Sequence, residues 1–250
     1  MIRCYLASEQ WNGPDAELDE TESRHLAGVL RAEIGLRIQV MDGQGHLGEA
    51  EVSSPHKKRT GLHLLSRTFV PPLQPHRILA QALVREQRMD WLIQKAVELG
   101  VHEIQPLQTD QAVVHIRPEE AEKKAARWRA IALGACKQSG NPWLPRIAPV
   151  VRFEQMMQQW RGGAACFGAL QEGAEPLAAY FGRLRKEACP QVTLFIGPEG
   201  DFSSREVDAL GAAEVQPVTF GPLVFRVETA ALYILSALQY AWQETKGVDE

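Results

Sequence analysis

From residue 76 onward, short apolar segments alternate with segments that have helical apolar spacing. The runs ILAQALV (78–84), EIQPL (103–107), AVVHI (112–116) and VTLFIG (192–197) have the length and composition of buried strands. Strands that alternate with helices form a mostly parallel sheet with helices on both faces. The sequence therefore predicts an α/β domain over residues 76–250.

The first 70 residues follow a different pattern, with short strand-like runs separated by turn sequences such as Asp42-Gly43. A short helix is predicted around residues 21–31. Residues 71–75 read PPLQP, and three prolines in five residues make a stiff connector. We therefore predict a separate β-rich domain over residues 1–70. Its candidate strands are 3–6, 36–41, 47–52 and 61–69.

Bulk composition excludes several classes of protein. The net charge of −4 means that any nucleic-acid binding must use a local basic patch. The four cysteines form no C-x-x-C pair, so we predict neither a metal site nor disulfides. No apolar run approaches the roughly 20 residues that span a bilayer, and the N-terminus lacks a signal-peptide pattern. These features favour a cytoplasmic protein.

The first motif, LFIGPEGDFSSRE, covers residues 194–206 and joins a buried strand to a helix. Ser203 and Glu206 form a capping-box pattern that starts the helix, and Gly211 is the predicted end. Gly197 and Gly200 permit unusual backbone conformations and let a ligand approach the main chain. The carboxylates of this loop disfavour a phosphate and suit hydroxyl groups or a positive centre. An ordinary turn with solvated acids is the alternative interpretation.

The second motif, VTFGPLVFRVETAALYILSAL, covers residues 218–238 and repeats the order of strand, Gly-Pro turn and helix. The helix, predicted over 228–244, is apolar on nearly every face and is therefore expected to be buried. Arg226 and Glu228 stand at its start, where burial would require partners. They either pair with each other or face a ligand. We expect both Gly-Pro loops to follow neighbouring strands and to form one pocket.

Together these segments resemble the two C-terminal signatures of the SPOUT methyltransferases, and within that class the chain is similar to the bacterial 16S ribosomal RNA uridine-N3 methyltransferase family. MIRCYL at the start, HLAGVLR (25–31), RMDWLIQKAVELGVHEIQPL (88–107) and ACKQSG (135–140) resemble further segments of that family. The resemblance runs from residue 1 to about 243. Asp201 is a departure, because the family usually has a second glycine there.

The resemblance implies a fold, a reaction and partners. The fold is a small PUA-like β-barrel that holds RNA, followed by a SPOUT-type, trefoil-knotted parallel sheet that binds S-adenosylmethionine. The reaction is methylation of N3 of a uridine. The partners are ribosomal RNA or the assembled small subunit, and a second copy of the chain in a homodimer. A SPOUT enzyme acting on a ribose 2′-hydroxyl, and a non-catalytic assembly protein, are the alternatives.

Uridine N3 is a poor nucleophile until its proton is lost, so the enzyme must stabilise the anion that forms on O2 and O4. A guanidinium suits this role, which we assign to Arg226, with Glu228, or less favourably Glu199, as general base. Apolar surface for the adenine ring is offered by Leu194, Ile196, Leu223 and Phe225, although plain core is the favoured interpretation of Leu194 and Phe225. The predicted cofactor-binding residues are Ile196, Gly197, Pro198, Glu199, Gly200, Gly221, Pro222, Leu223, Val224 and Arg226.

RNA contacts are predicted mainly on the first domain. The segment 56–67, HKKRTGLHLLSR, carries four basic side chains and no acid, which suits phosphate contacts, although a solvated hairpin would have the same composition. Gln138 and Ser139 are expected at the uridine pocket, with a helix cap as the alternative. The predicted RNA-binding residues are Arg3, Arg24, His25, Arg31, Lys57, Lys58, Arg59, Gln138 and Ser139.

Overall fold

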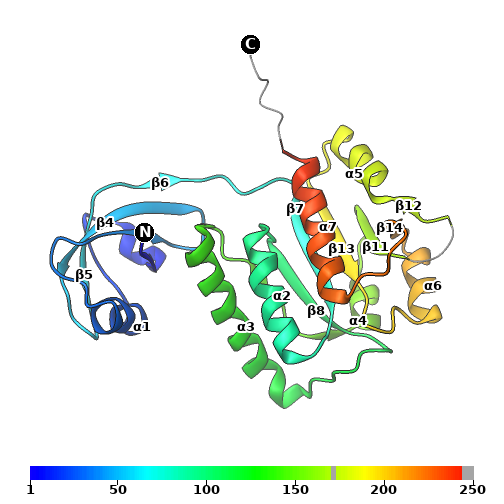
Figure 1. Ribbon diagram of the computed structural model, residues 1–250, viewed down its shortest axis with the longest axis horizontal. Helices are drawn as coiled ribbons and strands as arrows, with labels where there is room; N and C mark the ends of the chain where they lie inside the picture. The colour runs from blue at the N-terminus through cyan, green and yellow to red at the C-terminus, as the bar shows by residue number, and fades with distance from the viewer. Residues whose placement is uncertain (170–172, 244–250) are drawn as a thin grey trace, which may run out of the picture. The chain divides into compact units, whose positions relative to one another are not determined.

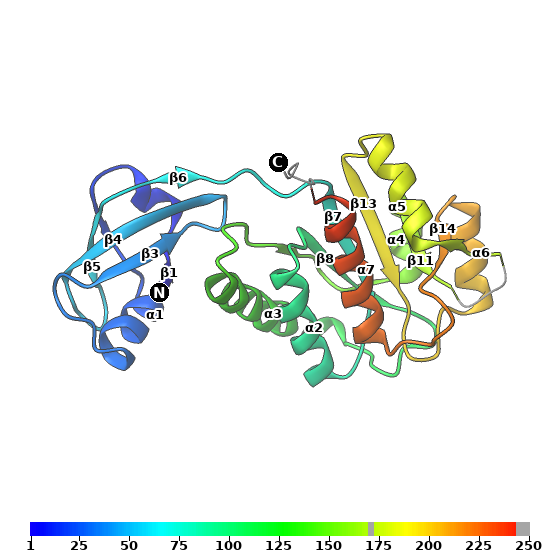
Figure 2. The same ribbon diagram turned by 45° about the horizontal axis from the view of Figure 1, so that its top comes forward.

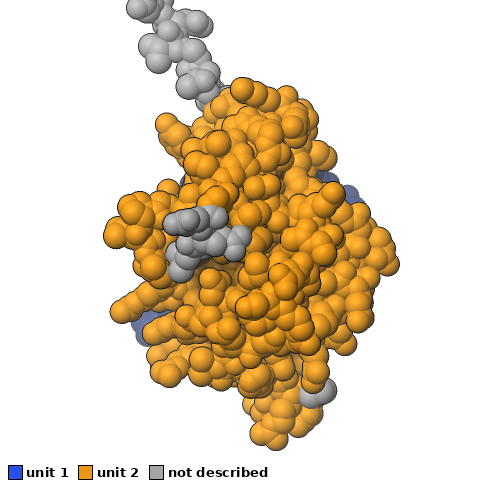
Figure 3. Space-filling model, turned by 90° about the vertical axis from the view of Figure 1, so that its right-hand side faces the viewer, with its two compact units in different colours: residues 1–72, 133–144 blue, residues 73–132, 145–250 orange. Residues whose placement is uncertain are grey.

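The computed structural model describes residues 1–169 and 173–243, and its elements are labelled in Figure 1. The chain divides into two compact units. The first contains residues 1–72 and 133–144, and the second contains residues 73–132 and 145–250. Figure 3 shows one face of the second unit. The sequence did not indicate that residues 133–144 group with the N-terminal residues, because long-range contacts decide this and local pattern does not.

The first unit is built on a mixed six-stranded sheet. β1 and β3 are parallel, and the other pairs are antiparallel. The strand predicted over 61–69 is in fact two strands, because β5 and β6 pair with different parts of β4. The order is β1 (Arg3–Tyr5), β3 (Arg37–Met41), β4 (His46–Ser54), β5 (Gly61–Leu64) and β2 (Asp15–Glu17), with β6 (Thr68–Phe69) paired to β4.

The predicted helix at 21–31 is present as α1 (Glu20–Ser23) followed by a π-helical segment (Arg24–Val29). Asp19 caps α1 by accepting a hydrogen bond from the backbone N–H of Glu22 at 2.8 Å. Leu26 is fully buried in the core of this unit, while His25 before it is exposed and Ala27 after it is half-buried. The amphipathic pattern therefore places one side of the segment on the sheet.

The second unit contains an eight-stranded sheet in which every pair is parallel. This confirms the predicted α/β class. The strand predicted at 112–116 is wrong: these residues form no regular structure, and Val113 is 62% exposed. The order is β10 (Val151–Arg152), β8 (Glu103–Gln108), β7 (His76–Ala82), β13 (Gln191–Ile196), β11 (Ala165–Gly168), β14 (Gln216–Thr219) and β12 (Glu175–Pro176), with β9 (Arg146–Ile147) paired to β8. Figure 2 labels β7, β8, β11, β13 and β14 of this sheet.

Helices cover the sheet in two groups. α7 contacts α2 and α5, whereas α4 contacts α6. Ala80 and Phe195, which are paired in register, pack in the same apolar cluster as Phe153 of α4 and Leu210 of α6. Side chains alternate across a strand, so the next pair, Gln81 and Ile196, faces the opposite side. The helices are α2 (Glu86–Glu98), α3 (Pro118–Ser139), α4 (Phe153–Gln159), α5 (Leu177–Lys186), α6 (Ser204–Ala212) and α7 (Val227–Ala241).

Two predicted features of the last helices are wrong. α6 continues through Gly211 to Ala212, because Glu214 adopts the left-handed conformation, φ 58°, that ends the helical segment. α7 is not wholly buried, since Tyr233 is 42% and Tyr240 is 79% exposed. It ends at Ala241, and the predicted end at residue 244 lies outside the described residues. Within the described chain, no helix combines the length and apolarity needed to cross a membrane.

Candidate active site

Three parallel strands end at one edge of the sheet of the second unit. β13 ends at Ile196, β11 at Gly168 and β14 at Thr219. β11 pairs with both β13 and β14, so it lies between them. The expectation that the two Gly-Pro loops follow neighbouring strands is therefore wrong. Parallel strands need long crossover connections, and the order along the chain does not determine which strand is skipped.

A cleft opens at this edge, with about 630 Å³ of space including the part open to solvent. Small-molecule sites commonly have volumes of about 300–1,000 Å³. Of the predicted cofactor residues, Gly200, Pro222 and Arg226 lie outside the lining. Seven of the predicted residues line it, and they are Ile196, Gly197, Pro198, Glu199, Gly221, Leu223 and Val224.

The sequence analysis missed the contribution of β11 to this cleft. Gly168 and Ala169, at the end of that strand, belong to the lining. The glycine that ends the AACFG run was the available signal. Phe225, interpreted as core, also lines the cleft, whereas Leu194 is fully buried in the core as expected. The remaining lining residues are Asp201, Phe220, Val227 and Ala230.

The first loop, residues 197–203, is fixed by contacts that come from other elements. Glu199 pairs with Arg88 of α2 at 3.2 Å, an ion pair that local sequence could not reveal. Neither Gly197 nor Gly200 has a positive φ, contrary to our expectation. A Cβ on Gly200 would lie 2.4 Å from Oε1 of Gln111, so that exposed side chain would have to move to accommodate it.

Asp201, where the resemblance implies a glycine, has a backbone conformation that suits glycine. Its φ is 64°, in the left-handed region that disfavours side chains with a Cβ. Aspartate tolerates this region because its short side chain bonds locally. Here Oδ1 accepts a hydrogen bond from the backbone N–H of Phe202 at 2.8 Å. The side chain therefore folds back on its own loop.

This geometry predicts unequal effects of two substitutions at residue 201. Asp201→Ala should lower the free energy of unfolding by about 1 kcal/mol, because it keeps the Cβ and loses the local bond. Asp201→Gly should stay within about 0.5 kcal/mol of the original, since glycine adopts this conformation without strain. Urea denaturation of the two variants measures the difference. Equal destabilisation by both would contradict this account of the loop.

The capping box predicted for α6 is confirmed, and it extends to a second loop. The hydroxyl of Ser203 accepts the N–H of Glu206 at 3.3 Å, and Oε2 of Glu206 accepts the N–H of Ser203 at 2.8 Å. Oε1 of the same buried carboxylate accepts the N–H of Asp110 at 2.9 Å. Glu206 thus ties the cleft loop to the segment after β8.

Side-chain contacts also join the cleft loop to the segment after β8. The hydroxyl of Ser203 donates to Asp110 at 2.6 Å, and this bond, with help from Arg205, holds the pKa of the Asp110 carboxyl below its usual value. Arg205 also bridges Asp110, at 2.8 Å, to Glu154, at 2.6 Å. These contacts join three separate segments of the second unit beside the cleft.

The second loop, residues 220–226, is held by aromatic packing. Phe220, Phe225 and Tyr233 form a trio with ring centroids 5.1–6.1 Å apart. Gly221 has a φ of 106°, which only glycine adopts readily. Leu223 and Val224 are 70% and 75% exposed. The loop therefore presents two apolar side chains to the cleft without burying them.

The predicted catalytic pair is separated rather than joined. Within the described residues, Arg226 and Glu228 form no ion pair; Arg226 is the exposed N-cap residue of α7. Glu228 is half-buried, and its Oε2 is buried and accepts no hydrogen bond from the described residues. A buried, unpartnered carboxylate oxygen is costly and suits a group that arrives from outside.

The predicted RNA-binding residues all lie in the first unit. His25, Arg31, Lys57 and Lys58 are exposed. Two of the arginines are neutralised, Arg24 by Glu20 at 2.5 Å and Arg59 by Glu17 at 3.6 Å.

Three of the predicted RNA-binding residues, Arg3, Gln138 and Ser139, make contacts at the C-terminal end of α3. Arg3 donates to the carbonyl oxygens of Lys137 and Gln138 at 3.0 and 2.9 Å. The hydroxyl of Ser139 donates to the carbonyl of Ala135 at 2.8 Å, one turn back within α3, and the placement of Ser139 at the uridine pocket stays a prediction.

Comparison with known proteins decides the family. A model described as the RNA methyltransferase domain matches residues 72–239, and one described as the RNA methyltransferase PUA domain matches residues 18–59. Ribosomal RNA small subunit methyltransferase E of Bacillus subtilis is 29% identical over 240 residues, covering 94% of this chain and 93% of the relative. The chain belongs to the ribosomal RNA small subunit methyltransferase E family.

Two solved structures agree with this assignment to the methyltransferase E family. A methyltransferase from Legionella pneumophila in complex with S-adenosylmethionine is 32% identical, has a TM-score of 0.87, and is matched over 96% of this chain and 98% of that one. Ribosomal RNA small subunit methyltransferase E from Neisseria gonorrhoeae, bound to S-adenosylmethionine, is 28% identical with a TM-score of 0.86 over 97% and 98%. The predicted family, its SPOUT-type fold with a PUA domain and the RNA methyltransferase class are confirmed. The trefoil knot stays a prediction.

Proposed function

We propose that this chain transfers the methyl group of S-adenosylmethionine to N3 of a uridine in 16S ribosomal RNA. The observation that carries the proposal is the cleft at the ends of β11, β13 and β14, which lies inside the region matched by the RNA methyltransferase domain. Relatives over most of the chain are named for methylation of small-subunit ribosomal RNA. The RNA and the reaction occur in the cytoplasm, which is where we place the protein.

The cleft fits S-adenosylmethionine chemically. Its lining combines apolar side chains for an adenine ring with main-chain groups of two Gly-Pro turns. Asp201 adds a negative charge that favours a cationic ligand and disfavours a phosphate, whereas the charge of Glu199 is balanced by Arg88. Bound S-adenosylmethionine supplies a methyl group on a sulfonium that is already a good leaving group. The chain therefore has to orient the acceptor and manage one proton.

Arg226 and Glu228 are the residues we assign to that task. Each sits beside a residue of the cleft lining, Phe225 or Val227. Exposed at the start of α7, the Arg226 guanidinium is free to spread over O2 and O4 of the uridine and stabilise the anion left when N3 loses its proton. The unpartnered Oε2 of Glu228 accepts that proton.

Methylation assays test the proposal. Ribosomal RNA and assembled small subunits are incubated with the protein and S-adenosylmethionine, and nucleosides are then identified by mass spectrometry. 3-Methyluridine is expected. A ribose-methylated nucleoside would indicate the alternative SPOUT reaction. No methylated product, with no calorimetric binding of S-adenosylmethionine at millimolar concentration, would indicate a non-catalytic RNA-binding protein.

We also propose that the protein acts as a homodimer, as the resemblance implies. Thr229, Tyr233, Ser236 and Tyr240 are exposed on α7 at spacings of four, three and four residues, which places them on one face of the helix. Two exposed tyrosines on such a face suit a protein interface. Light scattering should find a dimer, and Tyr240→Asp should shift it towards monomer. A monomeric original protein at micromolar concentration would refute the proposal.

A further inference from the structure

An aromatic ring is held in place, yet exposed, on β6 of the first unit. Phe69 is 54% exposed, although its ring contacts His46 at 5.3 Å and Trp143 at 5.8 Å between centroids. Trp143 is itself fixed, because its Nε1 donates to the carbonyl of Val70 at 2.9 Å. Gly45 makes the contact possible, since a Cβ there would lie 2.5 Å from Trp143 and 2.8 Å from Phe69. The ring is therefore pre-positioned with more than half of the residue accessible.

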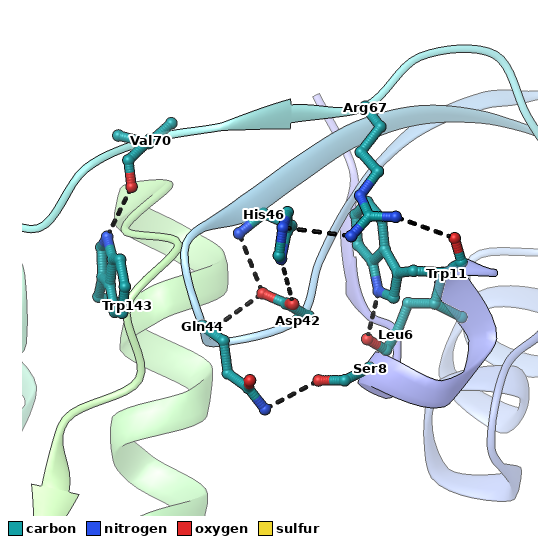
Figure 4. A network of polar contacts seen from close by, with 9 residues as sticks. All are labelled: Leu6, Ser8, Trp11, Asp42, Gln44, His46, Arg67, Val70 and Trp143. Atoms are coloured by element: carbon teal, nitrogen blue, oxygen red, sulfur yellow. Dashed lines mark hydrogen bonds and ion pairs between the residues drawn. The ribbon is translucent and has the colours of Figure 1, made fainter.

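A guanidinium is oriented two residues before this ring. Arg67 donates from Nη1 to the carbonyl of Trp11 at 3.1 Å, and its carbon Cζ lies 5.6 Å from the centroid of the Trp11 ring. Its Nη2 lies 3.2 Å from Nε2 of His46. Figure 4 shows Arg67 reaching both partners.

Asp42 sets the orientation of His46 and, through it, of Arg67. Oδ2 of this buried carboxylate lies 2.7 Å from Nδ1 of His46, which donates its proton there. Oδ1 accepts the backbone N–H groups of Gln44 and His46 at 2.7 and 3.0 Å. With the proton on Nδ1, the lone pair of Nε2 faces Arg67 and accepts from it.

Arg67 keeps its charge available. A guanidinium has five N–H donors, and the contacts above use two of them. In the described chain Arg67 has no carboxylate within 4.0 Å, whereas Arg24, Arg37 and Arg59 of the same unit each pair with a glutamate. An exposed, oriented and unneutralised guanidinium beside an exposed ring has the two features that bind single-stranded nucleic acid.

We infer that Arg67 and Phe69 form a subsite for one nucleotide of single-stranded RNA, with the phosphate on Arg67 and the base stacked on Phe69. The inference rests on the proposed function in that RNA is the substrate. Stacking on an aromatic face requires no particular base, so this subsite contributes affinity and register rather than sequence choice. Because both side chains are already ordered by their neighbours, binding costs little further conformational entropy.

Binding of a fluorescein-labelled ten-nucleotide oligouridylate, followed by anisotropy, tests the subsite. Phe69→Leu, which keeps apolar volume and removes the ring, should raise Kd at least about fivefold, since base stacking is worth ~1–3 kcal/mol per base. Phe69→Trp should remain within about threefold of the original. Ile34→Ala, which removes another exposed apolar side chain of the same unit, is the matched control and should change nothing.

The salt dependence of RNA binding distinguishes phosphate binding by Arg67 from base stacking by Phe69. Each phosphate contact on a single strand contributes about 0.7 to the slope of log K against log salt concentration. Arg67→Gln should therefore lower the slope by about 0.7. Phe69→Leu should leave the slope unchanged and lower log K by the same amount at every salt concentration. Arg37→Gln makes the same charge change at an ion-paired arginine and should lower the slope much less.

An unchanged Tm and an unchanged calorimetric affinity for S-adenosylmethionine would show that each variant is folded. Equal affinity for the oligouridylate in the original, Phe69→Leu and Arg67→Gln proteins would overturn the inference. The inference would also be overturned if the variants lost affinity for assembled small subunits but kept their affinity for free RNA, because that result would indicate a protein partner. If the original protein fails to methylate ribosomal RNA but these variants still weaken oligouridylate binding, the proposed reaction fails and the subsite stands.

Discussion

Arg226→Ala is expected to lower kcat for methylation of small-subunit ribosomal RNA by about 10²–10³-fold. The reason is that a donor group facing a developing anion typically supplies this much of the rate. Arg226 is exposed at the N-cap of α7 and has no ion-pair partner in the described residues, so its removal should not disturb the fold. Single-turnover kinetics with labelled S-adenosylmethionine measures the effect on the chemical step.

Two further variants make this prediction specific. Arg226→Lys keeps the charge but loses the planar fork, and it should recover only part of the rate. Arg185→Ala removes an arginine from the last turn of α5 in the same unit and should leave kcat unchanged. A raised KM for S-adenosylmethionine with an unchanged kcat in Arg226→Ala would make Arg226 a cofactor contact and remove its catalytic role.

Glu206→Ala is expected to lower the free energy of unfolding by about 2–4 kcal/mol. The substitution removes the acceptor of the backbone N–H groups of Ser203 and Asp110, and a hydrogen bond to a charged group contributes ~1.5–3 kcal/mol. It also removes one half of the capping box of α6. Because Glu206 ties the cleft loop to the segment after β8, affinity for S-adenosylmethionine should fall as well. Urea denaturation and calorimetry measure the two effects.

Asp208→Ala is the control for this prediction, because Asp208 is an exposed acid on the same helix. It should change the free energy of unfolding by no more than about 0.5 kcal/mol. If Glu206→Ala were no more destabilising than Asp208→Ala, the tie between the two loops would have no energetic importance. If Glu206→Ala lowered the free energy of unfolding but left the affinity for S-adenosylmethionine unchanged, the contacts of Glu206 would have a structural role only.

Local sequence was sufficient for the features that depend on neighbouring residues. The capping box of Ser203 and Glu206, the β-rich and α/β halves, and the two Gly-Pro turns at strand ends all follow from spacing of a few residues. The same short motifs carried the resemblance to the family. Local pattern also misled in places: the apolar run at 112–116 has strand composition but pairs with no strand among the described residues.

The tertiary structure decided which distant residues meet. It placed β11 between β13 and β14, and so brought Gly168 into the cleft. It paired Glu199 with Arg88 and left Oε2 of Glu228 without a partner. The sequence by itself determined the turns, the helix start and the family. The make-up of the cleft came from crossover connections and long-range pairing, which are set by the packing of the whole sheet and leave no mark in any single short segment.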